Sequence, residues 1–408
     1  MPNTPRGGLE RTKLVCFFCE TSRAADLGTR CDACEGSLVA VVDGELPENA
    51  KTFWDYAAVL PVGGERISLG EGNTPLLKLD RLFPDDEVYV KAEWTNATGS
   101  FKDRGSAIAV SAAKALGAKG VICASTGNNA ASVSAFAARA GLPCVVAVPQ
   151  GTPVNKITQA KAHGAIVLEV DGSFSDAYAE ANRIQSETEG WANLTSTYLN
   201  PYMTAAHATI FYEVQAELGD IGTIIVPIGA GPMLDGIMQG AEILKAAGRI
   251  SRLPAPMGVQ GAGCAPIADA YDRGLDFVEE WSAPVTGMPG SINDPLRGYA
   301  ADGTRTLRII RRAGGHAIAV SDDEIRRAML DLGQKEGMAA EPASVTPLAA
   351  LRKLPANLPR PIVLVVSGHA LKDPMAQAAA DQPSLDIAGG MRSKDVIDAA
   401  MKRYSSSS

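Results

Sequence analysis

Short apolar runs recur along the chain and alternate with segments in which apolar residues repeat at helical spacing. Small or turn-forming residues bound many of the runs, a pattern typical of strands in parallel sheets. We expect strands at 88–91, 120–124, 144–148, 166–170, 223–227, 257–260 and 362–366, and interpret 120–124, 144–148 and 166–170 as buried. We expect helices from Arg104 onward and at 128–140, 153–163, 233–247, 322–336 and 343–354. This alternation predicts open α/β sheets with helices on both faces.

The order of these elements also predicts how the chain is divided. We expect a small α/β domain over 86–190 and a large α/β domain over 191–395, preceded by a proline-punctuated connection over 45–85. Residues 1–44 form an N-terminal extension and residues 396–408 a C-terminal tail, whose last four serines we expect to be disordered. Ligands of open α/β sheets bind beyond the carboxyl ends of the strands, so candidate chemistry is sought there.

Composition and charge narrow the function by exclusion. Hydrophobic residues make up 46% of the chain and charged residues 21%, an ordinary globular balance. The net charge is −8 and no basic run occurs, which argues against a nucleic-acid partner. No apolar run reaches the roughly 18 residues that a membrane span requires, and the polar N-terminus lacks a signal-peptide core. We therefore expect a cytoplasmic protein without a membrane or nucleic-acid partner.

Four of the seven cysteines form two Cys-x-x-Cys pairs, Cys16 with Cys19 and Cys31 with Cys34. Two such knuckles can present four thiolates tetrahedrally to one Zn²⁺, whereas disulfides would be reduced in a cytosol. The alternative is a flexible tail with free thiols, but apolar residues flank both knuckles. The pattern therefore predicts a structural zinc ribbon. Four thiolates leave no open coordination position, so this metal is not expected to be catalytic.

One lysine, Lys102, lies between the glycine-containing turn 96–99 and the helix expected from Arg104. Loops at strand-to-helix junctions often carry function. A lysine is nucleophilic only as the free amine, which requires burial or a cationic neighbour. The residues alone leave two interpretations: a lysine that forms a Schiff base with an electrophilic cofactor, or a solvated lysine at a helix start.

Five motifs, in order along nearly the whole chain, resemble those of threonine synthase, a pyridoxal phosphate (PLP) enzyme of fold type II. The lysine motif is 96–105, with Ala97 where the family usually has proline. The others are 69–76, 125–128, 229–231 and 367–374. The resemblance implies two open, mostly parallel α/β sheet domains of PLP fold type II, besides the zinc-ribbon extension. It also implies PLP as cofactor, a small-molecule amino-acid substrate, and a homodimer as the common assembly.

The resemblance also implies a role for each matching residue. Lys102 forms the Schiff base with the cofactor and, once displaced, takes the substrate's α-proton. Asn128 hydrogen-bonds the cofactor's 3'-oxygen, and Ser367 faces its pyridine nitrogen. The remaining cofactor contacts are Phe101, Gly229, Ala230, Gly231, Pro232 and Met233. The substrate contacts are Ser100, Ser125, Thr126, Gly127 and Asn129.

Each of these positions has a physical reason and a simpler alternative. The loop 229–233 ends a strand and opens a helix, so its small residues allow close approach and the helix N-terminus attracts a phosphate. A hydroxyl at Ser367 cannot keep the pyridine nitrogen protonated as a carboxylate would, which favours elimination and replacement over transamination. Without the resemblance, the loop is also a common turn, Asn128 a helix N-cap and Ser367 a residue that ends a strand.

The chain departs from the family where a substrate phosphate would bind. Met203 and Ala208 stand where the family usually has an arginine and a lysine, and Asn129 stands where it usually has threonine. Lost cations weaken a phosphate pocket because charge-assisted bonds are lost with them. Lys156 and Arg297 are candidate replacements.

We therefore expect a threonine synthase-like enzyme that catalyses elimination and replacement at Cβ of an activated amino acid. The default substrate is O-phosphohomoserine, converted to threonine and phosphate. Alternatives are β-replacement on another activated amino acid, as in cysteine or cysteate synthases, and deamination of serine or threonine. A non-catalytic binding module is the alternative of a different class.

Overall fold

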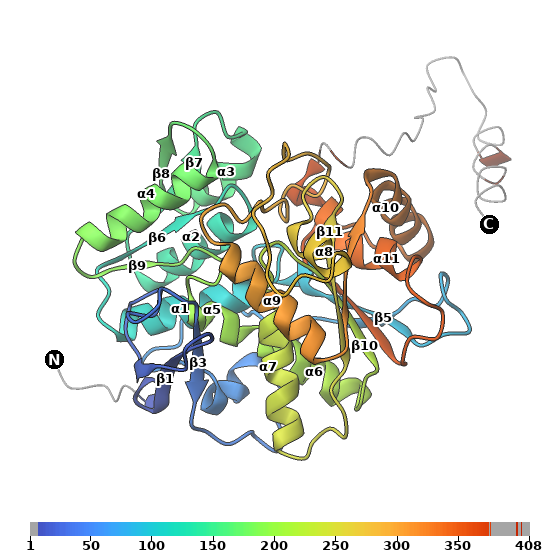
Figure 1. The fold of residues 1–408 in the computed structure, drawn as a ribbon, viewed down its shortest axis with the longest axis horizontal. Helices are drawn as coiled ribbons and strands as arrows, with labels where there is room; N and C mark the ends of the chain where they lie inside the picture. The colour runs from blue at the N-terminus through green and yellow to red at the C-terminus, as the bar shows by residue number, and fades with distance from the viewer. Residues whose placement is uncertain (1–6, 375, 377–396, 399–400, 402–408) are drawn as a thin grey trace.

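The computed structural model describes residues 7–374, 376, 397–398 and 401. Within them the chain forms two α/β parts, each built on an open sheet, and a small N-terminal module of three strands (Figure 1). The expected disorder of the last four serines falls outside the described residues, as does most of the expected tail at 396–408. No described helix is long and apolar enough to cross a membrane.

The smaller sheet is fully parallel and has the strand order β8-β7-β6-β9. Its strands are β6 (Gly120–Ala124), β7 (Cys144–Pro149), β8 (Ile166–Val170) and β9 (Trp191–Asn193). Its helices are α1 (Lys102–Ala115), α2 (Asn128–Ala140), α3 (Val154–Ala162) and α4 (Phe174–Glu187). Successive residues of β6 belong to the cores on opposite faces of the sheet, which is why this strand reads as a continuous apolar run.

The larger sheet has the order β12-β11-β10-β13-β5-β4, parallel except for the edge strand β4. Its strands are β4 (Leu76–Lys78), β5 (Val88–Ala92), β10 (Thr223–Pro227), β11 (Ala255–Gly261), β12 (His316–Val320) and β13 (Ile362–Val366). The following helices belong to the same part: α5 (Pro201–Ala206), α6 (Ala208–Leu218), α7 (Pro232–Ala246), α8 (Pro266–Asp272), α9 (Ala300–Arg312), α10 (Asp322–Glu336) and α11 (Thr346–Leu351).

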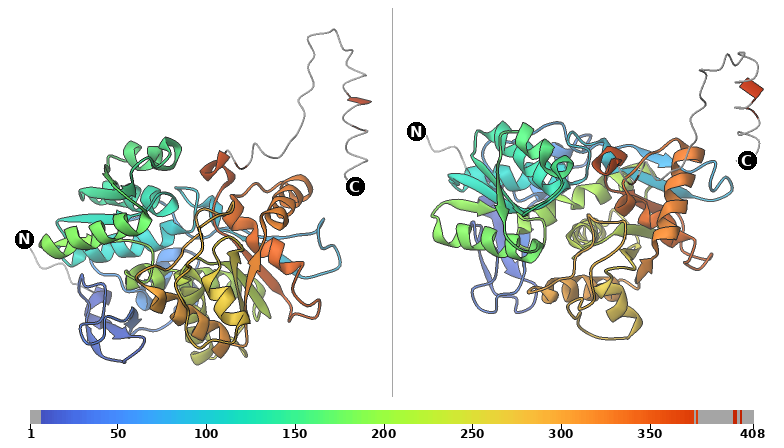
Figure 2. Two further views of the ribbon diagram at one scale, coloured as in Figure 1. Left: turned by 45° about the horizontal axis from the view of Figure 1, so that its top comes forward. Right: turned by 90° about the horizontal axis from the view of Figure 1, so that it is seen from above.

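The N-terminal module is an antiparallel sheet of order β2-β1-β3, formed by β1 (Thr12–Cys16), β2 (Ser22–Ala24) and β3 (Leu38–Val42). In both views of Figure 2 it lies at one side of the molecule, apart from the sheet of the small part. The short 3-10 helices η1 (Gly7–Arg11) and η2 (Phe53–Val59) flank it along the chain.

Three expectations from the sequence differ from the structure, two of them in single elements. The strand at 166–170 is not buried, because β8 is the edge of its sheet, and Ile166 is 68% exposed. The helix expected at 343–354 is a 3-10 turn, η4 (Pro342–Val345), followed by the shorter α11. Each of these two pieces has a proline in its first turn, and proline cannot donate the backbone hydrogen bond that would continue a preceding helix.

The third difference is that the sheets divide the chain elsewhere than at the expected domain boundaries. Strand β5 falls in the expected small domain at 86–190 but pairs with β13 of the large sheet. Strand β9 falls in the expected large domain at 191–395 but pairs with β6 of the small sheet. After β4, the chain therefore passes from the large sheet to the small one between β5 and β6, and returns between β9 and β10.

A buried cluster of charges holds the first of these crossings in place. Arg104 of α1 donates to both carboxylate oxygens of Glu93 at 2.8 Å and to Glu213 of α6 at 2.5 and 2.7 Å. Lys91 of β5 lies 2.7 Å from the same Glu213 carboxylate. Burial alone would raise the pKa of Glu213, but Arg104 and Lys91 lower it to about 2. The ionised carboxylate therefore stabilises the fold above its usual pKa of 4.5, and this contribution is lost as the pH falls towards 2.

Replacing Arg104 by methionine should be strongly destabilising. The variant leaves two carboxylates buried without their main partner, so we expect the free energy of unfolding to fall by about 3–5 kcal/mol. Urea unfolding at neutral pH measures it. Arg183→Met is the matched control, because Arg183 pairs with Glu180 and Glu187 on the exposed face of α4. We expect the control to change stability by about 0.5 kcal/mol or less. Equal losses in the two variants would show that the buried cluster does not stabilise the fold.

Candidate active site

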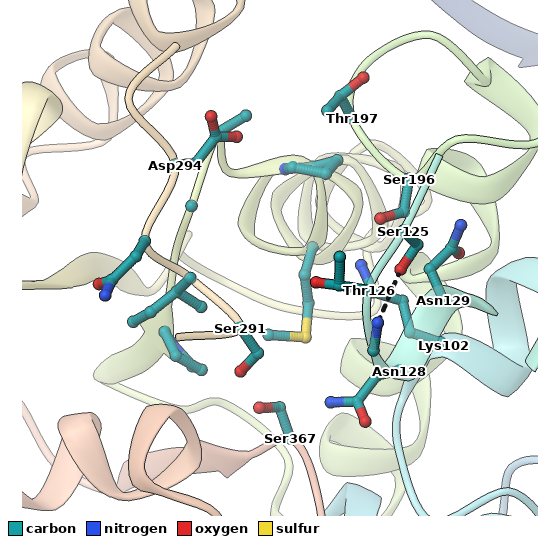
Figure 3. A pocket seen from close by; sticks show the side chains of 18 of the residues that line it. Lys102, Ser125, Thr126, Asn128, Asn129, Ser196, Thr197, Ser291, Asp294 and Ser367 are labelled. Carbon is teal, nitrogen blue, oxygen red and sulfur yellow. Dashed lines mark hydrogen bonds between the residues drawn. The ribbon is translucent and has the colours of Figure 1, made fainter. Parts of the chain in front are cut away.

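A cavity of about 270 Å³ opens between the two sheets at the carboxyl ends of β6, β10 and β13 (Figure 3). Four parts of the chain line it: the start of α1, the turn after β6, the segment after β9, and loops of the large part. The lining residues include Phe101, Lys102, Ser125, Thr126, Gly127, Asn128, Asn129, Gly229, Ala230, Gly231, Pro232, Met233 and Ser367. Every residue expected at the cofactor or substrate, except Ser100, therefore meets in one cavity.

Lys102 begins α1 and is held against the turn that follows β13. Phe101 donates its backbone N–H to the Ser367 carbonyl at 2.9 Å, and Ser100 pairs with Gly368 through the backbone. Ser100 is fully buried behind the pocket wall, and its hydroxyl has no hydrogen-bond partner. Desolvation lowers the pKa of Lys102 to about 8, against the opposing charges of Glu341 and Asp294. The enclosed lysine is therefore easier to deprotonate than an exposed one.

A carboxyl group that the sequence analysis missed connects Asn128 and Ser367. Asn128 donates from Nδ2 to Glu341 Oε1 at 2.8 Å. Ser344 donates to the same oxygen at 3.3 Å, and its hydroxyl lies 2.8 Å from that of Ser367. Burial raises the pKa of Glu341. The available signal was a single acidic residue inside the apolar run 338–343, a pattern that indicates a buried and partnered carboxyl group.

The loop 229–233 has the shape and polarity of an anion cradle. It joins β10 to α7, and Pro232 is the first residue of that helix. Gly231 has a φ of +105°, and a Cβ atom there would lie 2.3 Å from Thr306 Oγ1, so the backbone packs where no side chain fits. The first N–H groups of a helix have no intrahelical partner and carry the positive end of its dipole. The loop therefore fits a phosphate held by backbone donors.

The turn after β6 and the segment after β9 form the opposite wall, which is rich in polar groups. Asn129 donates from Nδ2 to the Leu194 carbonyl at 2.9 Å, which leaves its Oδ1 without a partner. Thr197 Oγ1 is also buried without a partner. Ser196, Ser125 and both of these residues line the cavity (Figure 3). Unpartnered polar atoms at a cavity wall indicate a polar ligand. The sequence analysis gave no role to 195–197, although a run of hydroxyl residues directly after a strand was a visible signal.

The positions expected to lack phosphate-binding cations do not reach the cavity. Met203 and Ala208 are buried and outside its lining, and Met203 packs against Gly105 of α1. Of the two candidate replacements, Lys156 lines the cavity, 3.4 Å from the Asp373 carboxylate. Arg297 does not line it, and its guanidinium lies 3.4 Å from the Trp281 carbonyl. Among the described lining residues, the cations are Lys102 and Lys156.

The four cysteines of the N-terminal module converge on one point. Their sulfur atoms all lie within 4.8 Å of one another. A tetrahedral Zn²⁺ with Zn–S bonds of about 2.3 Å requires sulfur atoms about 3.8 Å apart. The pairs Cys16–Cys34 and Cys19–Cys31 are 3.5 and 3.6 Å apart. The residues therefore fit a structural metal site.

The fold and the pocket together define an enzyme that holds a phosphate-bearing cofactor next to an enclosed lysine. The family described as "Pyridoxal-phosphate dependent enzyme" matches residues 67–368. The threonine synthase of Methanosarcina acetivorans is 36% identical over 382 residues, covering 88% of this chain and 92% of the relative. That of Halalkalibacterium halodurans is 37% identical over 332 residues, covering 78% and 89%. The chain belongs to the threonine synthase family of PLP-dependent enzymes.

Solved structures give the same fold. A threonine deaminase from the organism abbreviated T.th. superposes with a TM-score of 0.61 at 26% identity, covering 74% of this chain and 94% of its own. The L-serine ammonia-lyase of Rhizomucor miehei has a TM-score of 0.62 at 21% identity, covering 73% and 94%. The expected class of fold is therefore confirmed.

The pKa of Lys102 can be measured through its reaction with PLP. In protein stripped of cofactor, we expect the rate of PLP attachment to rise with pH and to be half-maximal near 8, because only the free amine reacts. Borohydride trapping followed by peptide mass spectrometry reports the rate at this lysine. The pKa of an ordinary lysine is 10.5, and a midpoint there would contradict the desolvated environment. Glu341→Gln should lower the midpoint further, since the Glu341 charge raises the pKa of Lys102.

Proposed function

We propose that this enzyme catalyses elimination and replacement at Cβ of an activated amino acid, with Lys102 as the base and O-phosphohomoserine as the first candidate substrate. The observation that carries the proposal is the convergence of Lys102, Asn128, Ser367 and the loop 229–233 on one cavity. Relatives named threonine synthase over most of the chain support the substrate. The products would be threonine and phosphate, with water as the nucleophile.

The residues of the cavity divide the work between holding and proton transfer. PLP, when bound, withdraws electrons from the substrate's Cα and so makes its proton acidic. Lys102 Nζ accepts that proton, and its lowered pKa keeps part of the amine neutral near neutral pH. Hydroxyl and backbone donors of the turn 125–129 hold the substrate carboxylate. The Ser367 hydroxyl meets the cofactor ring without supplying a full charge.

A second candidate is an amino acid whose leaving group carries no phosphate. This alternative is favoured by the burial of Met203 and Ala208 outside the cavity and by the presence of Lys156 as the one described lining cation besides Lys102. Burial also raises the pKa of Asp294, a carboxyl group that faces the cavity beside Gly229. With such a substrate, the same cavity would serve β-replacement or the deamination of serine or threonine.

Steady-state kinetics distinguish these candidates. The panel contains O-phosphohomoserine, O-phosphoserine, O-acetylserine, serine and threonine, with phosphate, amino-acid and 2-oxo-acid products all measured. Lys102→Ala should lower turnover of the preferred substrate by roughly 10²–10⁴-fold, the usual contribution of a general base, or abolish it. If the wild type turns over none of these substrates and binds no PLP, the proposal fails and the non-catalytic alternative stands.

Lys156 tests which substrate class fits. If the substrate is phosphorylated, Lys156→Met should reduce its kcat/KM by about 10- to 100-fold, through the loss of a charge-assisted bond. Turnover of serine should not change. Lys161→Met is the matched control, because Lys161 lies on the exposed face of the same helix α3. Efficient use of O-phosphohomoserine that survives Lys156→Met would show that another group binds the phosphate.

We also propose that the four-cysteine site holds one Zn²⁺ with a structural role. Its support is the sulfur geometry and the absence of a fifth ligand position in a site of four thiolates. Elemental analysis of the purified protein should give about one zinc per chain. Cys34→Ser should abolish it and Cys264→Ser should not, because Cys264 lies in the large part, far along the chain from the cluster. A full zinc content in the Cys34→Ser variant would contradict the proposal.

A further inference from the structure

The N-terminal module contacts the large part through a buried arginine of α9. Arg305 is fully buried and donates to Ser37 Oγ at 3.1 Å and to the Leu38 carbonyl at 3.0 Å. Its guanidinium also lies 5.0 Å from the ring centroid of Phe17. All three partners belong to the module, so it supplies much of the environment of this charge.

The other side of Arg305 faces the cofactor end of the large part. Its guanidinium forms an ion pair of 2.5 Å with Asp235, in the first turn of α7, and stacks 4.3 Å from the ring centroid of Tyr198. Figure 1 shows α9 and α7 beside each other. The helix whose N-terminus forms the phosphate cradle is therefore linked through Arg305 to the module.

The next residue of α9 reaches the cradle itself. Thr306 donates its hydroxyl to the Ala230 carbonyl at 2.5 Å. Because that proton is used, the Tyr198 hydroxyl must be the donor in its 2.8 Å contact with Thr306 Oγ1. Gly231 packs directly on the Thr306 side chain. The position of the loop is thus set by Thr306 and Tyr198, and both are held by the contacts of Arg305.

A second ion pair fixes the first turn of α9. Arg30 of the module donates to the two oxygens of the fully buried Asp302 carboxylate at 2.6 and 3.0 Å. It also reaches the Tyr178 hydroxyl of α4 at 3.4 Å. The module therefore holds α9 at Asp302 and at Arg305, on successive turns of one helix.

None of the described residues in 7–44 lines the cavity, so the module acts on it only through these contacts. The cradle binds phosphate through backbone groups, whose usefulness depends on being held in position before the ligand arrives. We propose that the metal-held module is a positioning device for the cofactor: through Arg305 and Thr306 it fixes the phosphate-binding loop, and its loss weakens PLP binding. A sheet of this size needs its metal to keep its shape. The inference rests on the assignment of the loop to PLP in the proposed function.

The test measures the dissociation constant of PLP by absorbance titration of protein stripped of cofactor. Thr306→Val keeps the side-chain volume and removes the hydroxyl, and we expect it to weaken PLP binding about tenfold, the effect of one lost hydrogen bond. Arg305→Met and zinc-free wild type should weaken it at least as much. The matched control is Arg312→Met, which removes an exposed ion pair between the same two helices, with Glu242, and should leave binding unchanged.

A combination experiment tests whether the effect passes through Thr306. If it does, removing zinc from Thr306→Val should add little, whereas independent effects would multiply. Circular dichroism identifies a variant that fails to fold, and Thr306→Val carries the test if Arg305→Met does. Wild-type PLP affinity in both Thr306→Val and the zinc-free protein would overturn the inference while leaving the proposed function intact. Failure of the wild type to bind PLP would instead overturn the proposed function.

Discussion

The buried pairing of Arg104 with Glu93 and Glu213 is the constraint on which the active site depends. Arg104 follows Lys102 by two residues, so the ion pairs that hold its guanidinium also fix the first turn of α1. Its partners come from the segment after β5 and from α6, which belong to the large part. Ion pairs of this kind stabilise only when every member is partnered, because an isolated buried charge is costly. The position of the reactive lysine is therefore specified by charges that never touch the ligand.

Much of the local structure was predictable from the sequence. Strands such as 120–124 and 362–366 have the expected bounds because a run of apolar residues buried on both faces is a strong local signal. Helix 322–336 also has the expected bounds, since Ser321 and Glu324 form a capping box and Gly337 ends it. The motifs at 125–128, 229–231 and 367–374 identified the loops that meet at the cavity.

Pairing between distant segments was not predictable. Nothing in the residues of β5 or β9 tells to which sheet each belongs, because both sheets accept the same apolar residues. The exposure of β8 follows from its place at an edge, which is also a property of the whole sheet. Glu341 escaped notice because its partners, Asn128 and Ser344, lie in separate elements. Ser100 matched the motif but lies behind the wall, since the chain turns there to pair with Gly368.

The two crossings of the chain also determine how the site can move. Lys102 lies just beyond the first crossing and Thr195–Thr197 lie on the second, while the turn 125–129 projects from the middle of the small sheet. Any rotation of one sheet relative to the other takes place about these two connections. Residues close to such a pivot travel little, whereas the tip of the turn travels further. The molecule can therefore close on a substrate carboxylate while the reactive amine stays in register with whatever the cradle holds.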